Sequence, residues 1–439
     1  GSNALDANTS GANNTALGSE ALGAVTSGVK NTALGAGTLD AVTTSDNNTA
    51  VGFDALGSNT GANNTAVGSD ALFANTSASN NTAVGKSALV ANTTGTNNVA
   101  IGALTLDANT TGNSNTAVGK DALTNSTTAN NNVAVGARAL DTNTTGDNNV
   151  AIGVEALEEN TTANNNTAVG FQALEENTTG TRNTAVGALA LDANTTADRN
   201  TAVGYAALSL NSNGTRNTGI GDGALGETTS GSYNTAVGQA ALNKNTTASN
   251  NCAVGYNALG LNTTGHQNTA VGAYALDSNT TAQDNVAVGF EAGNAITTGA
   301  SNTFVGSEAG HDNTAASNTG IGKRALFENT SGTSNTAVGK DALYNNTTAS
   351  NNTAVGTDCL QANTTGTGNT AIGKDGLFQN TTANNNTSVG YQALYANTTG
   401  FENVAIGSYA LDANTTGDEH VAIGYKALSA NTTANGNTA

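Results

Sequence analysis

The sequence of 439 residues contains no proline, methionine or tryptophan, and only 8 phenylalanines and 9 tyrosines. Hydrophobic residues make up 37% of the chain, and alanine supplies much of that share. A round globule of this length would need far more Leu, Ile and Phe to fill its core. The composition therefore favours an elongated array, in which each small unit buries its few apolar groups against its two neighbours.

Basic residues are also scarce, with 13 Lys and Arg against 32 Asp and Glu, which gives a net charge of −19. Nucleic acids and anionic membrane surfaces attract clustered Lys and Arg, so neither is an expected partner. No stretch approaches the length of a transmembrane helix, and we expect no direct membrane insertion of this segment. The simplest role for the acidic excess is to keep a long molecule soluble.

The few reactive side chains are scattered. Cys252 and Cys359 lie about six repeats apart, too far for an easy disulfide, and each is expected to be an ordinary packed side chain. His266, His311 and His420 fall at three different positions of the repeat, so they do not converge on a catalytic centre. We therefore expect a protein that is not an enzyme and that needs no cofactor and no metal.

What the sequence does contain is a repeat of seventeen residues. If the Gly of each V-G, I-G or L-G pair is position zero, these glycines recur every seventeen residues, except for two spacings of sixteen. Every charged residue then falls at position +1, +2, +5, +6, +11 or +12. This regularity predicts a chain that coils once per repeat and carries its charges at exposed turns.

Each repeat shows two candidate extended segments, as in residues 85–101. The first is N-T-A-V or N-V-A-I at +13 to +16, and the second is A-L-x-x-N-T-T at +3 to +9. Gly at zero and Gly or Ala at +10 separate them, as turns separate strands. We predict an all-β fold, a parallel β-solenoid (β-roll) of about 25 coils with seventeen residues per coil. Residues 1–439 are expected to form one continuous array within a longer chain.

The substitutions between repeats predict which side chains point inward. Positions +14 and +16 are expected to face the interior, because Phe304 occurs at +15 between them and a Phe is too large for a tight coil. Leu at +4 should be the main core residue of the second segment. The predicted core ladder includes Leu72, Leu89, Leu123, Val67, Val84, Ile101 and Val118.

Asparagine and glycine hold further fixed places. Position +7 is usually Asn, replaced by Val or Ile in three repeats, which suggests a place lined by the wall of the coil. Stacked amides there would form a ladder that satisfies its own donors and acceptors. The predicted ladder includes Asn75, Asn92 and Asn109. The predicted turn glycines include Gly68, Gly85, Gly102 and Gly119.

Such a coil has a small core, and small cores are often completed by association. The alanine row at +15 and the small residues at +3, if they face outward, would let a second chain approach closely. We therefore expect a homo-oligomer, with a trimer preferred over a higher filament.

The motif N-T-A-V-G or N-V-A-I-G, followed by x-x-A-L, resembles the head repeat of trimeric autotransporter adhesins of the YadA type and related repeats of bacteriophage tail fibres. Residues 98–102 and 420–424 match its S-V-A-I-G pattern most closely. The resemblance implies a left-handed, trimeric β-roll at a bacterial surface. The family repeat is nearer fourteen residues, so these coils carry a longer second segment.

The leading hypothesis is a non-enzymatic extracellular structural fibre, or an adhesin shaft or head, on a cell surface or a virion. A host-surface glycan or protein is a possible partner. The alternative is a solenoid that binds ice or glycans through exposed Thr and Asn ladders, with Thr at +8 outward and +7 and +9 turned in.

Two further patterns, one typical of calcium sites and one of glycosylation sites, are weaker. Acidic pairs at +5 and +6 of adjacent coils, Glu158–Glu159 and Glu175–Glu176, offer Ca²⁺ ligands but do not recur in every repeat. N-T-T and N-T-S sequons, for example at Asn75, Asn92, Asn109 and Asn177, are more simply explained as ladder residues than as glycosylation sites.

Overall fold

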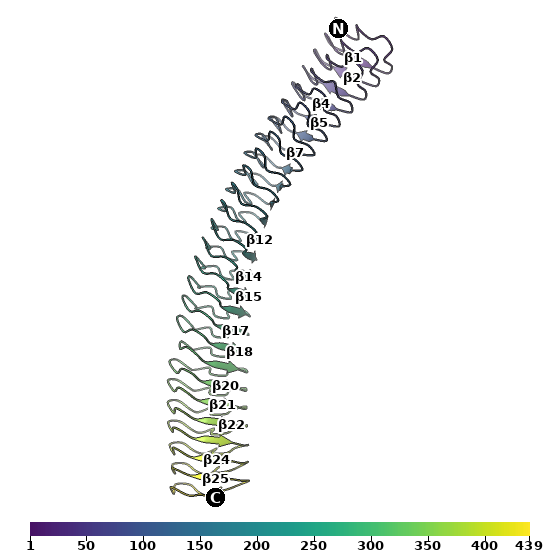
Figure 1. Cartoon of the computed structure of the whole chain (residues 1–439). Coiled ribbons are helices and arrows are strands. Elements are labelled where there is room, and N and C mark those ends of the chain that lie inside the picture. The colour runs from purple at the N-terminus through teal and green to yellow at the C-terminus, as the bar shows by residue number, and fades with distance from the viewer. The chain divides into compact units, whose positions relative to one another are not determined.

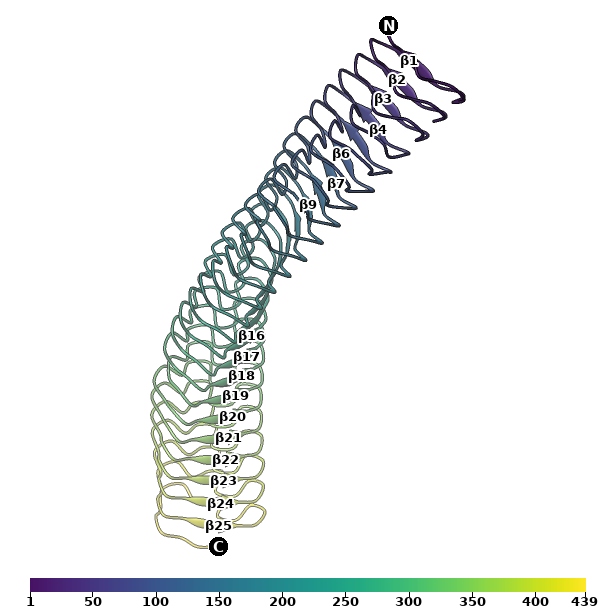
Figure 2. The same cartoon turned by 45° about the horizontal axis from the view of Figure 1, so that its top comes forward.

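The computed structural model describes all 439 residues and contains strands but no helix. Each strand is three residues long and occupies positions +14 to +16 of a repeat. The chain forms two compact units, residues 1–217 and 218–439. Within each unit the strands stack one above another, as Figures 1 and 2 show.

The first unit contains twelve strands: β1 (Thr15–Leu17), β2 (Thr32–Leu34), β3 (Thr49–Val51), β4 (Thr65–Val67), β5 (Thr82–Val84), β6 (Val99–Ile101), β7 (Thr116–Val118), β8 (Val133–Val135), β9 (Val150–Ile152), β10 (Thr167–Val169), β11 (Thr184–Val186) and β12 (Thr201–Val203). The second contains thirteen: β13 (Thr218–Ile220), β14 (Thr235–Val237), β15 (Cys252–Val254), β16 (Thr269–Val271), β17 (Val286–Val288), β18 (Thr303–Val305), β19 (Thr319–Ile321), β20 (Thr336–Val338), β21 (Thr353–Val355), β22 (Thr370–Ile372), β23 (Thr387–Val389), β24 (Val404–Ile406) and β25 (Val421–Ile423).

Neighbouring strands within a unit pair in parallel, and equivalent positions of successive repeats face each other. Between β5 and β6, for example, Ala83 lies opposite Ala100 and Val84 opposite Ile101. Pairing at a distance of one repeat makes each repeat one turn of a coil. The predicted parallel β-solenoid with about seventeen residues per turn is confirmed, and so is the strand at the end of each repeat. Its left-handedness stays a prediction.

The second predicted strand is wrong. Positions +1 to +6 form turns rather than a strand. Positions +2 and +4 have positive φ, as at Ser87 (56°) and Leu89 (53°), and such angles lie outside the β region. The turns of the coil are nevertheless tied together here, because the Leu89 N–H donates to the carbonyl of Thr105, one turn on, at 3.0 Å.

Position zero requires glycine for two reasons. Gly85 has a φ of 139°, which an L-residue with a side chain rarely adopts. A Cβ atom built there would lie 2.2 Å from the carbonyl oxygen of Gly102 in the next turn. The close stacking of turns and the left-handed bend therefore both fix this residue, as they do at Gly68, Gly102 and Gly119.

The predicted facing of the strand is inverted. Leu72, Leu89 and Leu123 are fully buried, and so are the alanines at +15. In contrast, Val67 is 37% exposed and Ile101 40% exposed. Val84 and Val118 are only half-buried. Placing these four in the core was therefore wrong. Ala at +3 and Leu at +4 already fill the interior from the opposite wall, which leaves room on the strand for a methyl group only.

Phe304 shows how a larger side chain enters this interior. It occupies +15 of β18 and is fully buried. The residues that would crowd it are all glycines, since a Cβ at Gly310 would lie 2.5 Å from the ring, at Gly320 2.8 Å, and at Gly293 3.3 Å. Gly293 and Gly310 stand where other repeats have Leu. One aromatic ring thus replaces two leucines and an alanine methyl.

We predict that Phe304→Ala lowers the free energy of unfolding by about 3 to 5 kcal/mol, because it leaves a cavity that no neighbouring Leu fills. Adding Gly293→Leu and Gly310→Leu to this variant should recover most of the loss. Urea unfolding of the three proteins measures both effects. A Phe304→Ala variant as stable as the parent would contradict this account of the core.

Candidate functional site

The amides at +7 form a ladder inside the coil. Asn92 is fully buried, and its Nδ2 donates to Asn75 Oδ1 at 2.8 Å and to the carbonyl of Gly95 at 3.0 Å. Asn109 repeats this pattern one turn on, donating to Asn92 Oδ1 at 2.8 Å. Each amide thus bridges two turns and also holds its own turn closed.

A second amide column at +13 binds the backbone. Asn98 is fully buried, and its Nδ2 donates to the carbonyl of Gly112 at 2.8 Å. Its Oδ1 accepts the backbone N–H of Asn115 in the next turn at 2.9 Å. Because Asn109 Nδ2 also donates to the Gly112 carbonyl, at 3.1 Å, the two columns converge on the backbone at +10. The interior of the solenoid is therefore as much an amide network as an apolar core.

The +7 ladder is interrupted at five positions, Val25, Val42, Ser126, Thr228 and Ile296. Ser126 replaces Asn, and both its Oγ and the facing Asn109 Oδ1 are buried without a hydrogen-bond partner. Ile296 also replaces Asn, and it leaves Asn279 Oδ1 unpartnered. Because the sequon asparagines Asn75, Asn92, Asn109 and Asn177 are fully buried, the folded repeats do not present their amide nitrogens for glycosylation.

Acidic side chains form the densest charged cluster outside the coil. Position +5 is acidic in four successive turns, at Asp141, Glu158, Glu175 and Asp192. Carboxylate oxygens of Glu155, Glu158 and Glu175 lie within 4.8 Å of one another. The cluster joins two successive turns of the first unit.

Arg138 is inserted into this cluster. Its Nη1 lies 3.1 Å from Glu155 Oε1, and its Nη2 is hydrogen-bonded to the buried Glu158. Gln172 Nε2 donates to Glu155 at 3.0 Å and to Glu175 at 3.3 Å. The oxygens that a Ca²⁺ ion would use already accept hydrogen bonds from side chains. Of the residues suggested for calcium, Glu158 and Glu175 come together, whereas Glu159 and Glu176 are exposed and stay outside the group.

Burial raises the pKa of the four successive +5 carboxyl groups, Asp141, Glu158, Glu175 and Asp192. For Glu158 the Arg138 guanidinium opposes this effect, and for Glu175 the nearby Glu155 adds to it. The pKa of Asp192 rises to about 6, chiefly because of burial, and its Oδ1 has no hydrogen-bond partner. These acids thus carry an electrostatic cost near neutral pH that Arg138 and nearby hydrogen-bond donors, among them Gln172, partly relieve.

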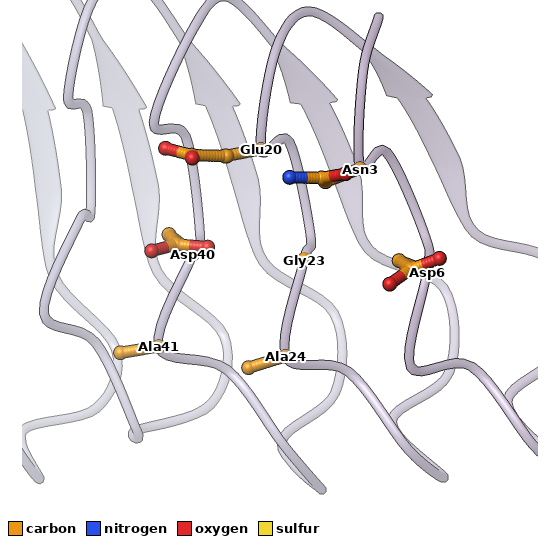
Figure 3. Close-up of a pocket in the computed structure, with 7 residues that line it drawn as sticks. All are labelled: Asn3, Asp6, Glu20, Gly23, Ala24, Asp40 and Ala41. Carbon is orange, nitrogen blue, oxygen red and sulfur yellow. The ribbon is translucent and has the colours of Figure 1, made fainter.

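A shallow notch near the N-terminus is also lined by acidic side chains (Figure 3). Asp6 and Asp40 stand at +5 two turns apart, and Gly23 lies between them with no side chain, which opens the notch. Glu20 extends along the same edge. No basic side chain lines this notch.

The three histidines stay apart, as their repeat positions indicate. His266 is exposed, and His311 stacks on Phe327 at a centroid distance of 5.0 Å. His420 is fully buried at +13 and stands where other repeats have Asn. Its Nδ1 accepts the backbone N–H of Asn437 at 3.1 Å, and its Nε2 lies 2.8 Å from the side-chain nitrogen of Asn431.

The two cysteines are separate free thiols. Cys359 is buried, and burial raises the pKa of its thiol to about 12, so it is unreactive at neutral pH. Cys252 occupies +14 of strand β15 and is half-buried. Neither thiol lies in a site with a neighbouring base.

The outer face of the strands is uncharged along each unit. Thr or Val at +14 and Val, Ile or Leu at +16 point outward along it, and no charged residue occurs at either position. The +8 threonines, expected to form an outward row, instead donate their hydroxyls to the backbone, as Thr93 Oγ1 does to Thr110 at 2.9 Å. Thr at +9 is exposed rather than turned in, as at Thr94.

Comparison with models of protein families finds no matching family, and comparison with curated proteins finds no similar sequence. The structure also contains no helix long and apolar enough to cross a lipid bilayer.

We predict that Asn98→Ala lowers the free energy of unfolding by about 2 to 4 kcal/mol, because it leaves the buried N–H of Asn115 without an acceptor. The matched control is Asn97→Gly, at an exposed neighbour whose φ of 61° suits glycine. The control should change stability by less than about 0.5 kcal/mol. Urea unfolding distinguishes the two, and equal effects would rule out the amide network as the cause.

The raised pKa of Asp192 predicts that the free energy of unfolding depends on pH. Its pKa is raised by folding from an ordinary 3.8 to about 6, so its contribution to stability is fully present below pH 3.8 and is lost as pH rises through 6. Relative to the parent, Asp192→Asn should therefore gain about 1 to 3 kcal/mol between pH 4 and pH 7. Glu176→Gln, at an exposed carboxylate, should show no such gain in thermal unfolding measured across this range. Parallel pH profiles for parent and Asp192→Asn would contradict the prediction.

Proposed function

We propose that this chain is a non-enzymatic, extracellular structural fibre segment whose copies associate side by side through the outer face of their strands. The repeats hold no group of nucleophile, base and orienting residue, and their most perturbed acids are tied to Arg138 or stand alone. A function carried by the repeated surface itself fits such a chain better than one carried by a single site.

The observation that carries this proposal is the outward facing of +14 and +16. Ile101 is 40% exposed and Ile152 41% exposed, and similar aliphatic side chains follow at +16 in every turn. Soluble monomers rarely expose a continuous apolar surface of this kind. A chain with a net charge of −19 repels its own copies, and this face is a long surface on which two copies meet without bringing charges together.

This interface replaces the one expected from the sequence. The alanines at +15 and the small residues at +3 are buried inside the coil, so they are not available to a second chain. The +14 and +16 columns offer a second chain the same kind of surface that was expected of +15 and +3, since their residues are uncharged and recur in every turn. A trimer remains our preferred assembly, because three flat faces can enclose one common apolar centre. A cell surface or a virion remains the proposed location.

The test introduces two charged residues on this face. Ile101→Lys with Ile152→Lys should weaken association at least about tenfold, because two desolvated aliphatic anchors become charged. Thr94→Lys with Thr145→Lys places the same charges on exposed +9 positions and should leave association unchanged. Sedimentation equilibrium of the parent should give a multiple of the chain mass of 43.0 kDa. A parent that stays monomeric at 100-fold varied concentration would refute the proposal.

The same face favours one second candidate. Its threonine column at +14 repeats at the spacing of the turns, about 4.8 Å, on a flat sheet, which is also what an ice-binding surface requires. A monomeric parent that shows thermal hysteresis, lost in the Ile101→Lys and Ile152→Lys variant but not in the Thr94→Lys and Thr145→Lys variant, would establish ice binding in place of self-association.

A further inference from the structure

Three of the five arginines of this chain stand in one column. Arg182, Arg199 and Arg216 occupy +12 in three successive turns of the first unit, and all three are exposed. Their backbones are held in stacked turns, since the Arg199 N–H donates to the carbonyl of Thr181 at 3.0 Å and the Arg216 N–H to that of Asp198 at 3.1 Å. The α-carbons of such a column are about 4.8 Å apart.

The column carries two energetic costs. Position +12 has positive φ, 59° at each of the three arginines, and most repeats place Asn, Ser or Gly there. Asn and Gly tolerate this region, whereas a long side chain costs of order 1 kcal/mol or more there. Like charges in adjacent turns add a repulsion of about 1 kcal/mol per neighbouring pair in water. Costs taken three times in succession indicate a function.

Arg182 and Arg199 are also treated differently from Arg138 and Arg324. Arg138 and Arg324 each bind carboxylates, with Arg324 Nε 2.8 Å from Asp341 Oδ1. Arg182 and Arg199 have no carboxylate within ion-pair distance. The acid nearest in sequence, Asp198, accepts the Thr181 N–H at 2.6 Å and is thereby tied to the turn before it.

We propose that the Arg182–Arg199–Arg216 column binds an acidic polysaccharide, whose sulfate or carboxylate groups recur along an extended chain. Guanidinium groups match both kinds of anion in bidentate geometry, and exposed guanidiniums bind them at little desolvation cost. Hydroxyl side chains at +9 of the same turns, Thr179 and Thr196, are exposed and suit the hydroxyl groups of a sugar. This site stands on its own and does not depend on the proposed association of copies.

A polysaccharide fits better than a nucleic acid. Proteins that bind single-stranded nucleic acid combine basic grooves with aromatic platforms for the bases, and the turns from residue 170 to 217 place no aromatic residue at +9, +11 or +12. Duplex binding draws on six to ten phosphate contacts, roughly, whereas this column offers three cations on a molecule of net charge −19.

The test replaces the column by the residue that other repeats use. Arg182→Asn with Arg199→Asn and Arg216→Asn should weaken binding of a heparin-type oligosaccharide at least tenfold in calorimetry at low salt. The slope of log affinity against log salt, roughly −2 to −3 for three released ions in the parent, should approach zero. An oligogalacturonate of equal length tells whether carboxylates suffice or sulfates are required. The matched control is Lys30→Asn, a lone cation at +12, which should change nothing.

Thermal unfolding guards against a structural explanation. The triple variant should melt at or above the temperature of the parent, because Asn suits positive φ and the repulsion is gone. A lower melting temperature would make the arginines structural and overturn the proposal. So would equal or tighter binding of single-stranded DNA of the same charge, the absence of binding to either oligosaccharide, or an equal loss in the Lys30→Asn control.

Discussion

The whole structure depends on hydrogen bonds between one turn of backbone and the next. They run around the coil, through the strand, through the turns at +1 to +6 and through the bend near +12. Because they hold equivalent residues about 4.8 Å apart, each side chain meets its own copy above and below. A residue type is acceptable at a position only if it can stack on itself. Amides and small aliphatic groups can do so inside, glycine can do so where turns nearly touch, and charges can do so only at exposed corners.

This self-stacking rule explains what the sequence could predict. The period, the parallel pairing and the strand at the end of the repeat follow from periodicity alone, and the structure agrees. The prediction that charges lie at exposed turns holds only in part, because Glu158 and Asp341 are buried. The amide ladder follows from the interchange of Asn with Val and Ile at one position. The facing of the strand did not follow, because Thr, Ala and Val are all compatible with either side of a sheet. The size of Phe304 suggests that +15 points outward. That inference is wrong, and it exchanges the predicted inward and outward sides of the strand.

The signal that would have corrected this error was present in the sequence. Gly293 and Gly310 stand at +4 in the two repeats that lack Leu there. Gly320 is one of the few residues at +15 that carry no methyl group. All three surround Phe304. When neighbouring residues of a stack change together in this way, the total side-chain volume inside the coil stays about constant. Phe304 therefore belongs inside the coil, on the same side as Leu at +4. In contrast, no periodicity predicts positive φ at Leu, because this conformation is stabilised only once the turns are stacked and the side chain is buried.

The charged columns show the limit of the same rule, because like charges do not stack without cost. The chain resolves this conflict in two ways. In the acidic column, Arg138 reaches into the next turn and binds the most buried glutamate. At Asp192, with no cation in reach, the carboxyl group instead holds its proton more tightly. At Arg182 and Arg199 neither solution exists, since a guanidinium does not lose its proton and no carboxylate lies within ion-pair distance. A repulsion that the folded chain leaves unrelieved is relieved only by an anion from outside, and that is why we infer a ligand at the arginine column and not at the acidic one.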